Sequence, residues 1–109
     1  MTIFERKQKW LGLVMRSNLT NAQKVFAYAV FDRMYGDKLW SFPTTEQLEE
    51  ATNLNRSKFG AHRRALFASG AMTGDKKHHH GQWANYTYTL NLDWDGEVDR
   101  VPSGPNPVP

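Results

Sequence analysis

The sequence predicts an α+β fold that is mainly α, with a helical core followed by a C-terminal β-hairpin. Apolar residues recur at helical spacing through most of residues 3–69. Three positions in that stretch carry side chains suited to cap a helix, namely Thr20, Thr44 and Asn55. After Gly70 the apolar period changes to two, which indicates strands.

The first two helices are expected over residues 3–16 and from Thr20 to about Gly36. Thr20 is followed by Gln23, which completes a capping box, and Gly36 suits a helix end. Residues 3–16 carry two apolar stripes, more than a small core needs: Phe4, Leu11 and Val14 on one, and Ile3, Trp10 and Leu13 on the other. The surplus stripe predicts either additional core or the contact of a homodimer.

A short strand is expected over residues 38–42 (KLWSF), because this aromatic segment is ended by a proline. Trp40 or Phe42 is expected to point inward from it. A third helix then begins at Thr44, where T-T-E-Q repeats the start signal and Glu46 lies near the positive end of the helix. Its inner face is expected from two apolar residues: Leu48 and Ala51.

A tight turn and a fourth helix follow. Asn53 tolerates a left-handed backbone, so we expect residues 52–54 to turn and Asn55 to cap a helix over residues 56–69 that ends at Gly70. At about 100° per residue, the inner side of this helix carries two large apolar residues and, less centrally, two basic ones: Phe59, Leu66, His62 and Arg63. The other side carries small residues with a projecting cation: Ser57, Gly60, Ala61, Arg64 and Ala68.

The hairpin is expected from residues 71–75 and 83–92, joined by the basic connection 76–82 (KKHHHGQ). Alternate residues of the second strand are expected to face the core: Ala84, Tyr86, Tyr88, Leu90 and Leu92. The domain is expected to cover residues 1–94. The acidic and then Pro/Gly-rich residues 95–109 are expected to form a disordered tail or linker.

Composition excludes several classes of protein. The chain has no cysteine, so it has no disulfide framework and no thiolate metal site. No apolar run approaches the roughly 20 residues that span a membrane, and the N-terminus has no signal-peptide core, so we expect a cytoplasmic protein. The formal net charge is +3, although four of the 11 acidic residues lie near the C-terminus. The rest of the chain is therefore more basic, which favours a polyanionic partner.

The order helix, helix, short strand, helix, tight turn, helix, hairpin resembles the winged helix-turn-helix family of DNA-binding domains, of the bacterial and phage type. The resemblance covers about residues 20–92 and is carried by Pro43, Thr44, Thr45, Glu46, Gln47, Leu48, Ala51, residues 53–59, Leu66 and Gly70. Asn53 stands where the family usually has Gly, and Asn55 where it usually has Ser, while Arg56 falls on the family's arginine. Arg63 occupies a slot that is usually apolar, and His62 one where a small residue is more common.

The resemblance implies double-stranded DNA as the partner, with the helix over residues 56–69 in the major groove. Small outward residues permit close approach to base edges, and arginine pairs bidentately with guanine. The expected DNA contacts are Thr44, Asn55, Arg56, Ser57, Lys58, Ala61 and Arg64, with Lys76, Lys77 and His78 on the hairpin, or wing. Base reading is expected chiefly from Arg56 and Arg64.

Several alternatives stay open. The preferred role is a small transcriptional regulator of a bacterium, phage or mobile element; the others are the DNA-binding domain of a replication initiator or recombination factor, and a protein-interaction winged helix. Residues 78–80 are three consecutive histidines, which converge poorly on one metal ion, so a solvated or phosphate-touching wing is favoured. Trp83, Tyr86 and Tyr88 could stack bases as a single-strand platform, but packing is favoured on an alternating strand.

Catalytic patterns are missing from the sequence. It contains no cysteine nucleophile, no Gly-rich phosphate loop and no recognisable pairing of an acidic residue with a histidine. We therefore expect no enzyme activity, no cofactor and no small-molecule ligand.

Overall fold

The computed structural model describes residues 1–77 and 85–98, and within them the chain forms four α-helices and a three-stranded antiparallel sheet. The helices are α1 (Ile3–Arg16), α2 (Asn21–Asp32), α3 (Thr45–Thr52) and α4 (Phe59–Ser69), and a 3-10 turn, η1 (Arg56–Lys58), leads into α4. The strands are β1 (Trp40–Ser41), β2 (Met72–Lys77) and β3 (Asn85–Leu90). The predicted α+β class, mainly helical, is confirmed.

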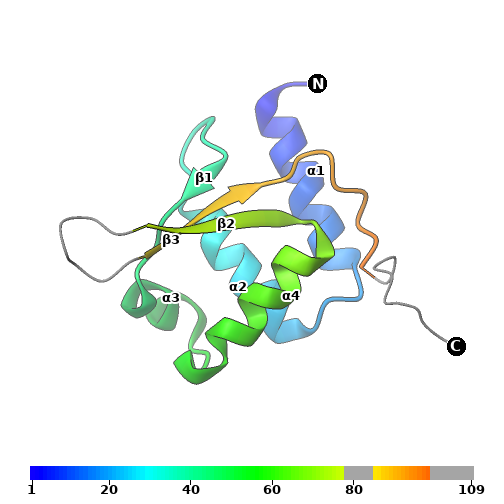
Figure 1. Ribbon diagram of the computed structural model, residues 1–109. Coiled ribbons are helices and arrows are strands. Elements are labelled where there is room, and N and C mark those ends of the chain that lie inside the picture. Colours follow the sequence, from blue (N-terminus) through cyan, green and yellow to red (C-terminus); the bar gives the residue numbers. More distant parts are fainter. Residues whose placement is uncertain (78–84, 99–109) are drawn as a thin grey trace, which may run out of the picture.

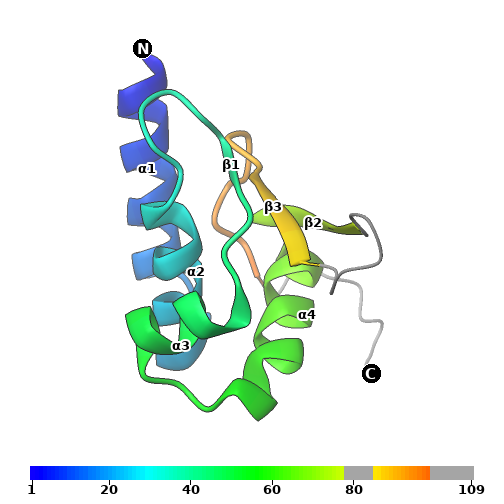
Figure 2. The ribbon, with the colours of Figure 1, turned by 90° about the vertical axis from the view of Figure 1, so that its left-hand side faces the viewer.

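Helix α2 is central, because it contacts α1, α3, α4 and β1. Strand β2 packs on α4, and the strand order is β1-β3-β2, so β1 and β2 are the two edges of the sheet. Helices α1 and α2 run side by side, and α4 lies beneath the sheet (Figure 1). In both this view and the view turned by 90°, β1 lies above α3 and α4 (Figure 2).

Side-chain caps decide where three of the helices begin. Thr20 Oγ1 accepts from the Gln23 backbone N–H at 3.1 Å, and the Gln23 side chain accepts from the Thr20 N–H at 2.9 Å, which confirms the predicted capping box. Thr44 caps α3 in the same way, as predicted. Thr2 and Glu5 form a further box at α1, a start that the sequence predictions left out although T-x-x-E is its pattern.

Helix α2 ends at Asp32, earlier than the predicted end near Gly36. The turn that follows is held by Lys7, whose buried ammonium donates to the carbonyl oxygens of Met34 at 2.7 Å and Gly36 at 2.9 Å. Burial lowers the pKa of Lys7, and the charge of Asp37 opposes that shift. Lys7 therefore ties α1 to the turn that leads toward β1.

Large aromatic side chains from α1, α2, α4 and β3 form much of the core. Trp10 is buried, and its indole N–H donates to the Ala71 carbonyl at 2.8 Å, which links α1 to the start of the hairpin. The Phe26 ring meets Phe59 edge-on, with centroids 5.3 Å apart. Of the two stripes on α1, the core uses parts of both, because Trp10 and Val14 are buried. Other fully buried side chains are Val30, Leu48, Leu66, Met72 and Tyr88.

Two predictions about inward-facing side chains are wrong. Trp40 and Phe42 are 41% and 58% exposed, whereas Ser41 between them is only 4% exposed. The Ser41 hydroxyl donates to the Val30 carbonyl at 2.9 Å. Because successive strand residues point to opposite faces, a buried Ser41 sends both neighbours outward. Ala51, predicted on the inner face of α3, is also exposed.

The segment after β3 belongs to the packed structure. Trp94 is buried, and its indole N–H donates to the Ser69 carbonyl at 3.0 Å. Asp93 pairs with Arg6 of α1 at 2.9 Å, and Val98 packs against the core. Packing therefore continues beyond residue 94, the predicted end of the domain. The rest of the predicted tail, residues 99–109, lies outside the described residues.

Candidate nucleic-acid interface

The connection between α3 and α4 is a tight turn at the predicted position. Asn53 has a left-handed backbone (φ 57°), and its N–H donates to the Glu49 carbonyl at 2.8 Å. The Leu54 N–H donates to the Thr52 hydroxyl at 3.1 Å. Asn55 then caps the next element, with its side-chain oxygen accepting from the Ser57 N–H at 2.9 Å. The turn and the cap are confirmed, but the first turn is the 3-10 segment η1, and α4 begins only at Phe59.

The inner side of α4 fixes how the helix is rotated. Phe59 and Leu66 are buried, as predicted. Arg63, in the slot that the family usually keeps apolar, donates from Nε to the Tyr88 hydroxyl at 2.8 Å, and its guanidinium carbon lies 4.3 Å from the centroid of the Tyr86 ring. Burial raises the pKa of Tyr88, and the hydrogen bond from Arg63 opposes that shift. Arg63 therefore holds α4 on β3.

His62 lies at the edge of the same packed layer. Its ring centroid is 5.9 Å from that of Phe26, and the side chain is half-buried. Burial lowers the pKa of His62, and the nearby charge of Lys58 lowers it further. The neutral imidazole is therefore favoured at this position, which makes His62 a packing residue rather than a cation of the outer surface.

The outer side of α4 and η1 is slim and basic. Its exposed residues are Ser57, Lys58, Ala61, Arg64 and Ala68. A Cβ atom built on Gly60 would lie 3.5 Å from Arg64 Nη1, so the Arg64 guanidinium passes close to Gly60. Within residues 1–77 and 85–98, neither Lys58 nor Arg64 forms an ion pair with an acidic side chain. Both cations are therefore available to an external anion.

Arg56, also predicted to read bases, differs from Arg64 because a carboxylate of the same chain engages it. Its Nη2 lies 2.6 Å from Glu49 Oε1, and its Nε donates to Glu49 Oε2 at 3.1 Å. Hydrogen bonds from Arg56 lower the pKa of Glu49, and Glu49 raises the pKa of Arg56 in return. The pair joins the end of α3 to the start of η1, so Arg56 is occupied by a carboxylate of its own chain.

The remaining predicted contact residues are Thr44, Lys76, Lys77 and His78. Thr44 is half-buried, and its hydroxyl is engaged as the cap of α3. Lys76 is exposed on β2, with Nζ 5.8 Å from the centroid of the Tyr86 ring. Lys77 pairs with Asn85 in the sheet ladder, while His78 lies outside the described residues, as do His79, His80 and Trp83.

Sequence patterns missed two features of these surfaces. Glu49 lies seven residues before Arg56, and only the turn between them brings the two side chains together. The outward direction of Trp40 and Phe42 depends on the hydrogen bond of Ser41, which no local pattern reveals. Opposite charges flank the predicted turn, but the sequence does not show which of Glu46, Glu49 and Glu50 reaches Arg56.

A comparison with protein-family models, curated proteins and solved structures finds no match to this chain. Among the described residues, no group of three or more histidine, cysteine, aspartate or glutamate residues could hold a metal ion. Each helix in the described part of the chain is too short or too polar to cross a lipid bilayer. Functional inference therefore rests on the topology and on the chemistry of the surfaces.

Proposed function

We propose that this protein is a winged helix-turn-helix protein that binds a specific site on double-stranded DNA, with α4 in the major groove. The observation that carries the proposal is the outer side of η1 and α4, where small residues flank Lys58 and Arg64. Among the described residues, neither of these cations forms an ion pair with an acidic side chain. The order α2, β1, α3, turn, α4 and hairpin, with β1 paired to β3, supports it. The preferred role is a small transcriptional regulator of a bacterium, phage or mobile element.

The physical fit comes from shape and donors together. A helix reaches base edges in the major groove only where its outward side chains are small, and Ser57 and Ala61 meet that condition near the start of the helix. Arg64 offers guanidinium donors that match the two acceptors of guanine. Lys58 suits a phosphate. Arg56 reaches DNA only if it exchanges the carboxylate of Glu49 for a phosphate.

The hairpin supplies further phosphate contacts in this proposal. Lys76 is exposed on β2, and Lys77 and His78 follow it in the sequence. Each duplex phosphate that a protein neutralises adds about 0.9 to the magnitude of the log–log slope of affinity against salt. The slope obtained from titrations at several salt concentrations therefore gives the number of phosphate contacts.

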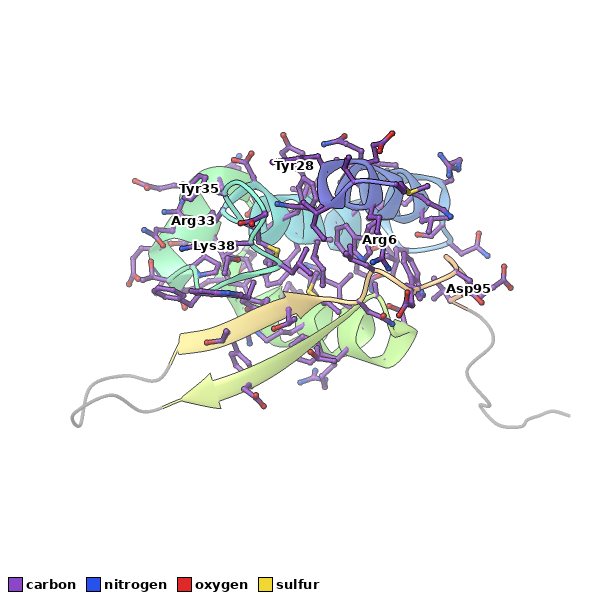
Figure 3. The ribbon with its side chains drawn as sticks, turned by 90° about the horizontal axis from the view of Figure 1, so that it is seen from above. Arg6, Tyr28, Arg33, Tyr35, Lys38 and Asp95 are labelled. Carbon is purple, nitrogen blue, oxygen red and sulfur yellow. The ribbon has the colours of Figure 1, made fainter. Side chains whose placement is uncertain are left out.

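A homodimer through α1 fits a regulator, because two copies read two half-sites. Exposed apolar side chains gather where α1 meets α2: Met15, Val25 and Tyr28. Tyr28 lies on the helical side of the molecule, away from the sheet (Figure 3). Light scattering of wild type and of Tyr28→Ser tests this contact; a dimer that becomes a monomer in the variant supports it, and a monomeric wild type refutes it.

The decisive experiment selects a duplex site from a random pool and measures its affinity for wild type and for Arg64→Ala by fluorescence anisotropy. The loss of a bidentate base contact is expected to cost about 1–3 kcal/mol, or about five- to 150-fold in affinity. Arg16→Ala is the matched control, because it removes an exposed arginine from α1. An unchanged affinity in Arg64→Ala, or an equal loss in both variants, contradicts the proposal.

The location of the selected sites separates the remaining roles. Sites near promoters support a regulator. Repeated sites near an origin or an attachment site support the replication or recombination role. If heparin displaces every duplex in the pool, so that no specific site is selected, the protein-interaction role gains support.

A further inference from the structure

The edge strand β1 and the residue after it, Phe42, expose a pair of stacked aromatic rings. The centroids of the Trp40 and Phe42 rings are 5.6 Å apart, and their planes differ by 14°. Tyr35, in the turn before β1, is exposed as well. We name these three residues the aromatic platform. In Figures 1 and 2 this turn and β1 lie above α4, so the two segments occupy different parts of the molecule.

Two cations accompany the aromatic platform. Lys38 Nζ lies 5.1 Å from the centroid of the Trp40 ring, and Arg33 and Lys38 both line a hollow of about 280 Å³ against the three rings. The rest of the lining is uncharged: Ser41, Pro43 and Gln47. In the part of the chain that the structure describes, neither cation forms an ion pair with an acidic side chain.

The row of the sheet beside Trp40 extends this surface with uncharged polar groups, while the exposed carboxylate of Asp75 lies further along the same face. Thr89 of β3 pairs directly with Trp40, and Thr73 of β2 pairs with Thr89, so the three side chains lie in one row across the outer face of the sheet. Both threonines are exposed. Figure 3 shows Arg33, Tyr35 and Lys38 at one end of the molecule, with Arg6 and Asp95 at the other. The hollow and the adjoining sheet therefore form one surface that combines rings, cations and hydroxyl groups.

We propose that the aromatic platform binds unpaired bases of a single-stranded nucleic acid, with Arg33 and Lys38 contacting its phosphates. Bases stack on exposed rings irrespective of sequence, since every base presents a flat π face, while basic side chains follow the backbone. Paired bases are stacked within a duplex and expose only their edges in the grooves. The aromatic platform therefore selects strands that are already open.

Charge favours a nucleic acid over the other occupants of an exposed aromatic surface. A second copy of this chain would have to bring acidic groups against Arg33 and Lys38, or leave both cations buried without partners, which costs free energy. A single strand satisfies rings and cations together. The inference does not depend on duplex binding by α4, because the two surfaces share no residue.

The experiment measures the affinity of labelled, unstructured single strands, in a DNA and an RNA version, by fluorescence anisotropy. Trp40→Ala and Phe42→Leu are each expected to weaken single-strand binding about tenfold, while binding to the selected duplex changes less than about twofold. Phe42→Leu keeps an apolar side chain and removes only the ring. Trp40→Phe keeps a ring and is expected to retain most of the affinity. Binding of either nucleic acid at this surface supports the proposal.

Two controls separate this surface from the rest of the molecule. Arg16→Ala removes an exposed cation from α1, and it is expected to leave single-strand affinity unchanged. Arg64→Ala is expected to leave single-strand affinity unchanged even where it abolishes duplex binding. The two activities can therefore fail independently.

Three outcomes overturn the proposal. The first is equal single-strand affinity in wild type, Trp40→Ala and Phe42→Leu when circular dichroism shows that all are folded. The second is equal binding of an abasic strand of the same length, because that strand retains the phosphates and lacks the bases. The third is a dimer in light scattering that Phe42→Leu converts to a monomer without any change in single-strand affinity. If Trp40→Ala does not fold, Phe42→Leu and Trp40→Phe decide the question alone.

Discussion

The outer side of α4 and the aromatic platform are both basic, but they differ in the shape that accompanies the charge. On the outer side of η1 and α4 the exposed residues beside the cations are small, such as Ser57 and Ala61. Beside β1 the residues between the cations are aromatic rings, and Trp40 stacks on Phe42. A helix with small outward side chains fits the major groove, whereas an exposed aromatic ring stacks on an unpaired base. Positive charge alone therefore does not specify which form of nucleic acid a surface suits.

The two surfaces also differ in what holds their cations. Arg56, at the start of η1, is held by the carboxylate of Glu49. Lys38 is held over the Trp40 ring. An aromatic ring positions a cation without neutralising its charge, so Lys38 keeps its attraction for a phosphate, while Arg56 must first give up a partner. The following predictions test these differences, from the largest expected effect to the smallest.

Ala61→Leu tests the slimness of α4. A leucine at this exposed position is expected to keep α4 away from the base edges and to lower duplex affinity about tenfold. Stability is expected to change by less than about 0.5 kcal/mol, since the side chain lies on the surface. Anisotropy titrations and chemical denaturation measure the two quantities.

Ala68→Leu is the matched control for that substitution, because Ala68 is exposed near the C-terminal end of the same helix. Helix-turn-helix proteins usually make base contacts from the first part of the recognition helix, so we expect duplex affinity to change less than about twofold. An equal loss in the two variants would show that the outer side of α4 does not approach DNA by its first turns.

Glu49→Gln tests the role of the carboxylate that occupies Arg56. The substitution releases Arg56 and removes a negative charge, so duplex affinity is expected to rise about two- to fivefold. Stability is expected to change little, because exposed ion pairs contribute weakly. Glu50→Gln is the control, as it removes the same charge from an exposed neighbour. If Glu50→Gln raises affinity equally, the release of Arg56 contributes nothing.

His62 tests the packing beneath α4 through pH. Burial, then the charge of Lys58, lowers the pKa of His62 in the folded protein, so as pH falls through the ordinary histidine value of about 6.5 the unfolded chain takes up the proton first. This contribution to stability is therefore present above that pH and is lost toward acid. Denaturant titrations of His62→Gln are expected to show a smaller loss of stability on acidification than wild type. Identical pH dependence in both proteins would refute the shift.

Local sequence was sufficient wherever a side chain bonds to the backbone a few residues away. The boxes at Thr20 and Thr44, the left-handed Asn53 and the Asn55 cap could all be predicted, because each uses atoms within four residues. The inner side of α4 could be predicted as well, since Phe59 and Leu66 keep helical spacing. Helical periodicity over many residues specifies one face unambiguously.

Prediction failed where the deciding atom comes from a distant part of the chain. Strand β1 has two residues, which is too short for a period to show which side faces inward. The Val30 carbonyl of α2 decides the matter by accepting the Ser41 hydroxyl, and both aromatic neighbours are then exposed. Large rings were expected inside because of their apolar surface, but β1 pairs with β3 in a register that puts Ser41 beside the buried Tyr88 and leaves both rings exposed.

The sequence by itself determined the helix starts, the turn before α4, the mainly helical class and the small, basic character of the helix over residues 56–69, because these follow from short-range hydrogen bonds and from the spacing of side chains along one element. Only the tertiary structure decided which cations stay available and which rings face solvent. Glu49 reaches Arg56 across a turn, and Val30 reaches Ser41 from another helix. Such contacts depend on how separate elements are placed in space, which no single stretch of the chain contains.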